Sequence, residues 1–389
     1  MSEQKPTRKH GKHKSYTTTI LFLVVFCLIF SVFVIPMGLA NTLNTLMNTA
    51  YDLLVSTTLY IMAIAVIAGA LSALFAEFGV IDLLNDLLSP LMKPLFGMPG
   101  ASALGVVTTY LSDNPAILTL ADDPEYRSYF KAYQIPALTN LGTSFGMGLI
   151  VTTFVLGLGH TAGEHVGIAA LCGNLGAVVG SVVSTRLMLR VTGRSLGKNA
   201  PAPILPEHKI KHIDEDAGGA IRIMNAIMDG GRKGVDLGLG IIPGVLIICT
   251  LVMMLTNGVP EGGVYTGAAY EGIAVLPKIA EKLDFILKPL FGFSSASGIA
   301  VPVTALGSAG AAMGMIPALL EKGLANCGDV AVFTAMCMCW SGYLSTHVSM
   351  MDVLKSTKFT GHAIISHTIG GICAGVAAHW LYVLMMLFI

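Results

Sequence analysis

Long apolar stretches separated by short polar ones run through most of the chain, and their lengths predict membrane-spanning helices. A helix needs about 20 residues to cross about 30 Å of hydrocarbon. Seven stretches are long enough, near residues 17–36, 55–76, 134–158, 166–189, 237–257, 330–350 and 361–387. The pattern therefore predicts an all-α integral membrane protein with about seven spans.

Two further apolar stretches are interrupted, so neither reads as an ordinary span. Residues 94–120 are apolar at both ends but broken at 111–115, and residues 289–320 are broken at 307–310. Non-helical backbone at membrane depth is tolerated only inside protein or beside a water-filled cavity. We therefore expect two re-entrant helical hairpins, each followed by a broken transmembrane helix. For the first hairpin, a single kinked span is the alternative.

The two hairpins belong to a sequence repeat. The pentapeptide KPLFG at residues 93–97 recurs at 288–292, and Thr109 corresponds to Thr304 at the same spacing of 195 positions. Many secondary transporters consist of two repeats with the substrate between them. The chain accordingly divides into a basic tail (1–16), a first repeat preceded by an extra helix (17–191), a linker (192–217) and a second repeat (218–389).

The distribution of Lys and Arg predicts the orientation. Basic residues gather in the tail and again at Arg190, Arg194 and Lys198, directly after a span. Cytoplasmic segments carry this excess, so the N-terminus and the linker are expected in the cytoplasm. The two hairpins then enter from opposite faces, which makes the repeats inverted. Residues 218–236 are predicted to form an amphipathic surface helix, and an additional span at 258–280 is the alternative that would remove the inversion.

Composition narrows the function. The chain is 54% hydrophobic and only 12% charged, whereas soluble domains carry about 25% charged residues. Acidic and basic residues balance at 23 each, and no basic face predicts nucleic-acid binding. No P-loop, hydrolase, kinase or redox motif is present, so we expect no enzymatic activity, no metal site and no cofactor.

Polar residues cluster at the two hairpin tips and at the breaks in the helices that follow them. Interrupted helices expose amides that suit anions and carbonyls that suit cations. The candidate substrate-binding residues are Thr109, Ser112, Asn114, Asn140, Thr304, Ser308, Ser341, Ser345 and His347. Any single Ser or Thr among them could instead bond its own helix backbone, and His347 could be a packing residue or a proton carrier.

Asp113 is the sole carboxylate inside either hairpin. An ionisable residue at membrane depth indicates function, although an Asp before Pro115 could also cap the helix that starts there. Asp113 is assigned to ion coupling together with Thr143 and Ser144 of the neighbouring broken span, with Na⁺ or H⁺ as the coupling ion.

The hairpins and the breaks after them resemble the nucleoside-recognition, or Gate, domain family. This family includes the spore maturation proteins A and B, the membrane part of ferrous iron transporter B, and concentrative nucleoside transporters. With NAIMDGGRKG at 225–234 and the second KPLFG at 288–292, the chain looks like a fusion of the paired YjiH–YjiG or spore-maturation A–B halves. The resemblance implies a bacterial inner-membrane protein with its substrate between two hairpin tips. The acidic and Gln/Asn substrate motifs of the nucleoside transporters are not found.

Together these features predict an ion-coupled secondary transporter of a small polar or anionic solute that binds near the membrane midplane. The alternative is a non-transporting membrane scaffold or regulatory module. Transport predicts that polar tip residues face a shared hydrated cavity, whereas a scaffold would pack them against one another or against a partner. The expected partners are the solute, membrane lipid and a second copy of the chain.

Overall fold

The protein is helical throughout the part of the chain that the structure describes. The computed structural model describes residues 16–112, 114, 116–121, 124–202, 219–260, 262–341 and 343–389. No strand occurs in these ranges, and only one isolated β-bridge links Lys131 to Pro201. Six helices are long and apolar enough to cross a membrane, or seven if one bent pair is counted as a span. The predicted all-α membrane fold is confirmed.

The elements follow the predicted order of spans and hairpins. The first half contains α1 (Tyr16–Met37), α2 (Leu39–Asp52), η1 (Leu53–Thr58), α3 (Leu59–Glu77), α4 (Val80–Leu91), η2 (Met92–Phe96), α5 (Ser102–Leu111), α6 (Ala116–Ala121), α7 (Pro124–Ser128), α8 (Ala137–Thr143), α9 (Gly148–Gly157), α10 (Gly159–Ala162) and α11 (Val166–Leu196). The second half contains α12 (Gly219–Pro243), η3 (Gly244–Cys249), α13 (Thr250–Thr256), α14 (Val275–Lys282), α15 (Asp284–Phe291), η4 (Ala296–Ile299), α16 (Ala300–Ala305), α17 (Ala309–Glu321), α18 (Cys327–Cys339), α19 (Tyr343–Val353), η5 (Thr357–Phe359) and α20 (Thr360–Met386).

Each repeat supplies a hairpin, a broken helix and a long helix. The hairpins are α5–α6 and α16–α17, the broken helices are α8–α9 and α18–α19, and the long helices are α11 and α20. The two long helices pack closely against each other, since a Cβ added to Gly180 would lie 2.5 Å from the Gly370 carbonyl oxygen. Small residues permit such close helix contact inside a membrane. We call these elements of both repeats the repeat bundle.

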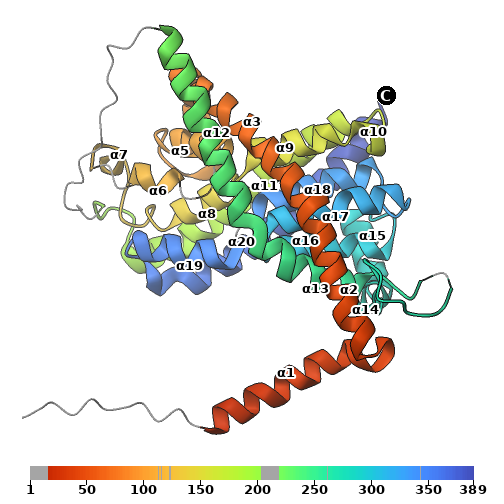
Figure 1. Ribbon diagram of the computed structural model, residues 1–389. Coiled ribbons are helices and arrows are strands. Elements are labelled where there is room, and N and C mark those ends of the chain that lie inside the picture. The colour runs from red at the N-terminus through yellow and green to blue at the C-terminus, as the bar shows by residue number, and fades with distance from the viewer. Residues whose placement is uncertain are drawn as a thin grey trace, which may run out of the picture.

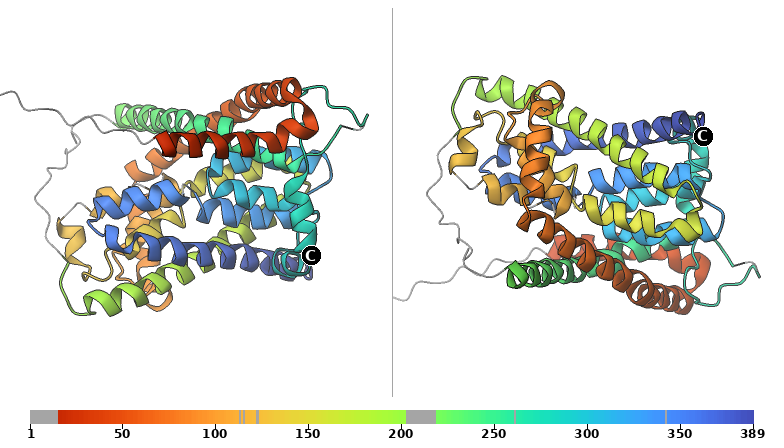
Figure 2. Two further views of the ribbon diagram at one scale, coloured as in Figure 1. Left: turned by 90° about the horizontal axis from the view of Figure 1, so that it is seen from below. Right: turned by 90° about the horizontal axis from the view of Figure 1, so that it is seen from above.

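Helices α3 and α12 lie together on one face of the repeat bundle and cross in front of it (Figures 1 and 2). Their contact also depends on glycine. A Cβ on Gly230 would lie 2.2 Å from the Gly69 carbonyl oxygen, and one on Gly234 would lie 2.4 Å from that of Ala65. The two backbones therefore touch directly, and we call these two helices the α3–α12 pair.

Two element boundaries differ from those expected from the sequence. The polar stretch between the predicted spans at 17–36 and 55–76 is itself helical and forms α2. Its polar face is satisfied by the segment 257–274: Asn41 donates to the Tyr265 carbonyl at 3.1 Å and Asn48 to that of Gly267 at 2.8 Å. Residues 219–236 are not a separate surface helix, because α12 continues through η3 and α13 as one span candidate.

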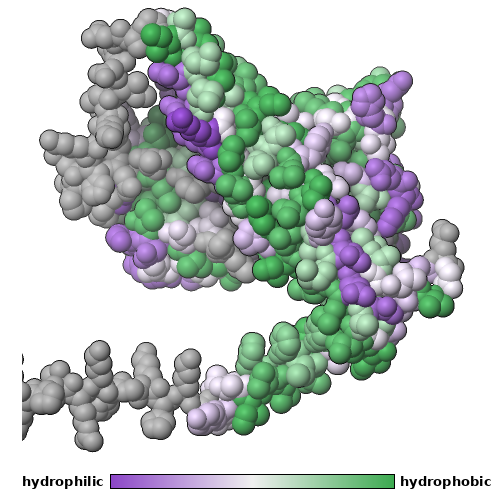
Figure 3. Space-filling view, in the orientation of Figure 1, coloured by the Kyte–Doolittle hydropathy of each residue, from purple (hydrophilic) through white to green (hydrophobic). Residues whose placement is uncertain are grey.

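The extra span considered at 258–280 does not form, since α14 begins only at Val275. At the other end of the protein, α1 extends away from the body (Figure 1), and only Phe33 and Met37 near its end are buried. Hydrophobic residues cover most of the visible surface of α1 and α3, whereas hydrophilic residues follow the upper part of α12 (Figure 3). Exposed apolar helices of this length suit contact with lipid.

Candidate solute-binding site

A cavity of about 700 Å³ lies where both hairpin tips, both helix breaks and the α3–α12 pair meet. This volume falls within the range of pockets that hold small ligands, about 300–1,000 Å³. The bundle contributes Ser112 and Asn114 from the first tip, Gly307–Gly310 from the second tip, and Met147 and Ser341 from the two breaks. Segments far apart in the sequence thus form a single wall.

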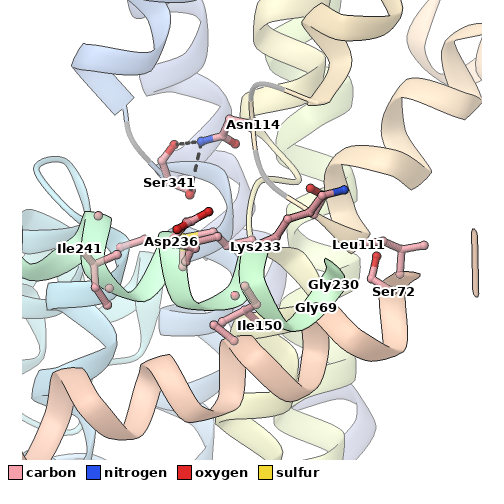
Figure 4. Close-up of a pocket in the computed structure, with 18 of the residues that line it drawn as sticks. Gly69, Ser72, Leu111, Asn114, Ile150, Gly230, Lys233, Asp236, Ile241 and Ser341 are labelled. Atoms are coloured by element: carbon pink, nitrogen blue, oxygen red, sulfur yellow. Dashed lines mark hydrogen bonds between the residues drawn. The ribbon is translucent and has the colours of Figure 1, made fainter. Parts of the chain in front are cut away.

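The first hairpin tip is anchored to the second repeat. Asn114 donates from Nδ2 to the Ser341 carbonyl oxygen at 2.7 Å (Figure 4). The same side chain also fits against the first repeat, because a Cβ on Gly146 would lie only 1.5 Å from Asn114 Oδ1. Glycine at the break in α8–α9 therefore makes room for the tip, and Asn114 connects the two helix breaks.

The second hairpin tip packs on α12 instead. Ser308 ends the first arm in extended backbone, and its hydroxyl accepts the Ala311 amide at 3.2 Å as the N-cap of α17. Caps of this kind satisfy amides that the first turn of a helix leaves free. A Cβ on Gly244 would lie 2.6 Å from Ser308 Oγ, and one on Gly310 would lie 3.0 Å from Ile241 Cδ1. The second tip therefore lies directly against the α3–α12 pair.

Lys233 and Asp236 of α12 are the only charged residues among the described residues that line the cavity. Both are exposed, and both rise from α12 on the side that faces Asn114 and Ser341 (Figure 4). Neither residue was predicted as part of the site, because residues 218–236 were expected to form a helix on the membrane surface. The available signal was Gly230, Gly234 and Gly238, whose spacing of four residues is typical of a helix packed closely on another helix.

The structure separates the predicted site residues into three groups. Ser112, Asn114, Ser308 and Ser341 line the cavity. Six others are buried in the packing and do not line it: Thr109, Asn140, Thr143, Ser144, Thr304 and His347. Asp113 lies outside the described residues, and so does the side chain of Ser345.

Three of the buried hydroxyl groups bond their own helices. Thr143, Ser144 and Thr304 each donate to the carbonyl four residues earlier, at 2.7 to 2.8 Å. This is the ordinary way in which Ser and Thr satisfy their hydroxyls within apolar helices. Each of these three hydroxyls therefore directs its proton to the backbone of its own helix.

A buried polar chain connects Asn140 to His367. Asn140 donates from Nδ2 to Ser184 Oγ at 2.9 Å, and Ser184 Oγ lies 3.0 Å from His367 Nδ1. His367 Nε2 contacts the Cys339 carbonyl, which can only accept, so Nε2 carries the proton and Nδ1 accepts from Ser184. The ring is therefore satisfied in its neutral form, and the chain holds α8, α11, α18 and α20 together.

His347 lies beside this chain, with its ring centroid 4.6 Å from that of His367. Its Nδ1 donates to the Tyr343 carbonyl at 2.6 Å. Across the described residues, no group of three or more His, Cys, Asp or Glu is arranged to hold a metal ion. The polar side chains that form these contacts near the breaks are amides, hydroxyls and imidazoles.

Comparisons with solved structures identify the fold. A double variant of the concentrative nucleoside transporter CNTnw in an outward-facing state superposes with a TM-score of 0.54 at 13% identity, covering 84% of this chain and 75% of that one. CNTnw in an inward-facing substrate-bound state gives 0.53 at 14% identity, with the same coverage. A variant in an intermediate state gives 0.50 at 13% identity, covering 83% and 76%.

The chain therefore has the fold of these membrane transporters. No protein-family model matches it, and neither does any curated protein sequence. The predicted resemblance is thus confirmed at the level of fold for its nucleoside-transporter branch. The likeness to spore-maturation and YjiH–YjiG proteins stays a prediction.

Proposed function

We propose that the chain is a secondary transporter that binds a small polar or charged solute in the cavity between its hairpin tips. One observation carries this proposal: both tips and both helix breaks converge on one cavity of about 700 Å³. Transporters built from two repeats generally place substrate at such a meeting point. The structural neighbours were captured in outward-facing and inward-facing states, and this supports an alternating mechanism here.

The polar residues at the cavity favour transport over a scaffold role. In a scaffold, the tip residues would pack on one another and leave little space. Here Ser112 is exposed and Ser308 is partly exposed, and both line the cavity. Hydrated polar groups inside an apolar protein are expected along a solute pathway. Coupling to Na⁺ or H⁺, with Asp113 as the coupling residue, is part of the proposal.

Filling the cavity is the sharpest test. Gly240 lines it, and a Cβ at this position would meet nothing within 4 Å. Gly240→Phe should therefore fold and occupy the space that the solute needs. Gly167→Phe is the matched control, because Gly167 is also helical and exposed with nothing within 4 Å, but does not line the cavity.

The measurement is uptake into proteoliposomes of a panel of radiolabelled amino acids, carboxylates and nucleosides, with a Na⁺ or pH gradient. We expect saturable uptake of at least one solute by the wild-type protein and by Gly167→Phe, and none by Gly240→Phe. Equal uptake by the two variants would contradict the assignment of the cavity. Absence of uptake of every solute by the wild-type protein would favour the scaffold alternative.

A further inference from the structure

We propose that Lys233 and Asp236 hold the two ends of a zwitterionic solute, so that the substrate carries one anionic and one cationic group. This inference rests on the proposed function and names the substrate class of the same cavity. Lys233 would bind the anionic group, such as a carboxylate, and Asp236 the cationic group, such as an ammonium. The neutral groups of the bundle wall would contact the rest of the molecule.

The rotation of α12 directs these two residues into the cavity. Gly230, Gly234 and Gly238 pack on α3, and a Cβ on any of them would lie within 2.4 Å of an atom of that helix. With about 3.6 residues per turn, Lys233 and Asp236 then project from a different face of α12. Both residues line the cavity, whose lining also includes Gly230 and Gly234 at the contact with α3. A backbone contact this close leaves α12 little freedom to rotate.

Within the described part of the chain, neither charge has an oppositely charged partner. Among the described residues, Lys233 and Asp236 make no ion pair, although their spacing of three residues would allow one. Asp229 and Arg232, at the same spacing on the same helix, do pair at 3.5 Å and do not line the cavity. Charges beside apolar walls are costly unless they are hydrated or paired. Lys233 and Asp236 are thus left to water or to a solute.

The charge balance of the described lining residues favours a zwitterion over a simple anion or cation. One positive and one negative side chain line it, and its other described lining residues are neutral. A solute with a single charge would leave one of the two unpaired. Residues three apart on a helix have Cβ atoms about 5–6 Å apart. Solute charges separated by a similar distance would therefore reach both side chains.

A series of ω-amino acids tests both the charges and their separation. The purified protein is heated with β-alanine, 4-aminobutyrate or 6-aminohexanoate, and with butyrate, butylamine or uridine as comparison compounds. We expect at least one zwitterion to raise the melting temperature, and neither butyrate nor butylamine to do so. Losing one charge-assisted contact should weaken the apparent affinity about tenfold in Lys233→Gln and in Asp236→Asn.

Arg232→Gln is the matched control, since it removes a charge from the same helix outside the cavity and should bind like the wild-type protein. The exchange Lys233→Asp with Asp236→Lys keeps both charges and should restore part of the binding if folding is intact. The inference is overturned if butyrate, butylamine or uridine stabilises the protein and no zwitterion does. It is also overturned if Lys233→Gln and Asp236→Asn bind like Arg232→Gln. Either result would leave the transporter proposal intact, because that proposal depends on the comparison of Gly240→Phe with Gly167→Phe.

Discussion

The α3–α12 pair and the repeat bundle face each other across one cavity but meet it with different kinds of residue. The pair is held by glycine-to-backbone contacts and presents the two charges, Lys233 and Asp236. The described residues of the bundle present neutral hydroxyl and amide groups on the hairpin tips, and one of these tips is anchored by Asn114. We infer that the pair provides a fixed, charged surface, and that the tips form the adjustable side of the cavity.

The largest expected effect comes from breaking the α3–α12 contact. In Gly234→Leu the new side chain would start 2.4 Å from the Ala65 carbonyl oxygen, which is backbone and cannot move aside. Overpacking commonly costs about 1–3 kcal/mol, and more is expected where two backbones touch. We expect loss of the monodisperse peak in size-exclusion chromatography. Gly240→Leu on the same helix is the control, because a Cβ at Gly240 would meet nothing within 4 Å, and this variant should elute normally. Equal elution of both variants would contradict a tightly packed pair.

A second prediction concerns the carboxylate of the first tip. Asp113 lies outside the described residues, so its role depends on the sequence. Asp113→Asn keeps the size and most hydrogen bonds but removes the charge. We expect the variant to fold and to lose ion-dependent uptake or ion-dependent thermal stabilisation. Asp284→Asn, at the exposed start of α15, is the control. Unchanged ion dependence in Asp113→Asn would reduce Asp113 to a helix cap.

The two tips should also differ in what holds them. Asn114→Ala removes the 2.7 Å bond to Ser341 and leaves a buried carbonyl without this donor, which costs about 1–3 kcal/mol. Ser308→Ala removes only the cap of α17, at a cost of about 1 kcal/mol. Chemical unfolding in detergent measures both. A larger loss for Ser308→Ala would show that the first tip is not anchored more firmly than the second.

The smallest expected effect is on the segment that covers α2. Glu271 is buried there, and burial alone would raise the pKa of its carboxyl group. Hydrogen bonds from Thr266 and from the Gly267 amide have the larger effect, so the pKa is lowered from 4.5. The folded state therefore binds the proton less well than the unfolded chain. The ionised Glu271 carboxylate therefore stabilises the folded segment fully above the pKa of the unfolded chain. This stabilisation is lost as the pH falls from that value through the lower pKa of the folded state.

Limited proteolysis of the 257–274 segment is the measurement. Cleavage of the wild-type protein should increase as the pH falls from about 5 to about 3. The increase should begin near the pKa of the unfolded glutamate, about 4.5. Glu271→Gln should be cleaved at a rate that does not depend on pH in this interval, after correction for the protease. Identical pH profiles for the two proteins would contradict the role of the Glu271 carboxylate.

The spans and hairpins could be predicted from the sequence because apolar length and helix-breaking residues are local properties. The position of Lys233 and Asp236 in the cavity could not be predicted in this way. An amphipathic surface helix and a helix lining a cavity show the same pattern in one dimension, and only the contacts of Gly230 and Gly234 with α3 distinguish them. Residue type also failed to separate Ser144, which bonds its own backbone, from Ser341, which lines the cavity.

Contacts between the two repeats also could not be predicted from the sequence. Asn114 was predicted to bind solute, but its partner Ser341 lies 227 residues away. Nothing in the local pattern indicates that the amide reaches the other helix break. Both residues still line the cavity. An anchoring role and a role in solute binding are therefore compatible for Asn114.

Access to the cavity from each side of the membrane tests the central claim most directly. Ser112→Cys places a thiol on an exposed, cavity-lining position, in a background where the exposed Cys27 is replaced by Ser. Glu164→Cys, exposed and outside the cavity, is the control. A membrane-impermeant maleimide should label Ser112→Cys from one face, less so with bound solute, and from the opposite face when the solute gradient is reversed. The control should label from one face only throughout. Labelling of Ser112→Cys from a single face under every condition, unaffected by any transported solute, would contradict the account.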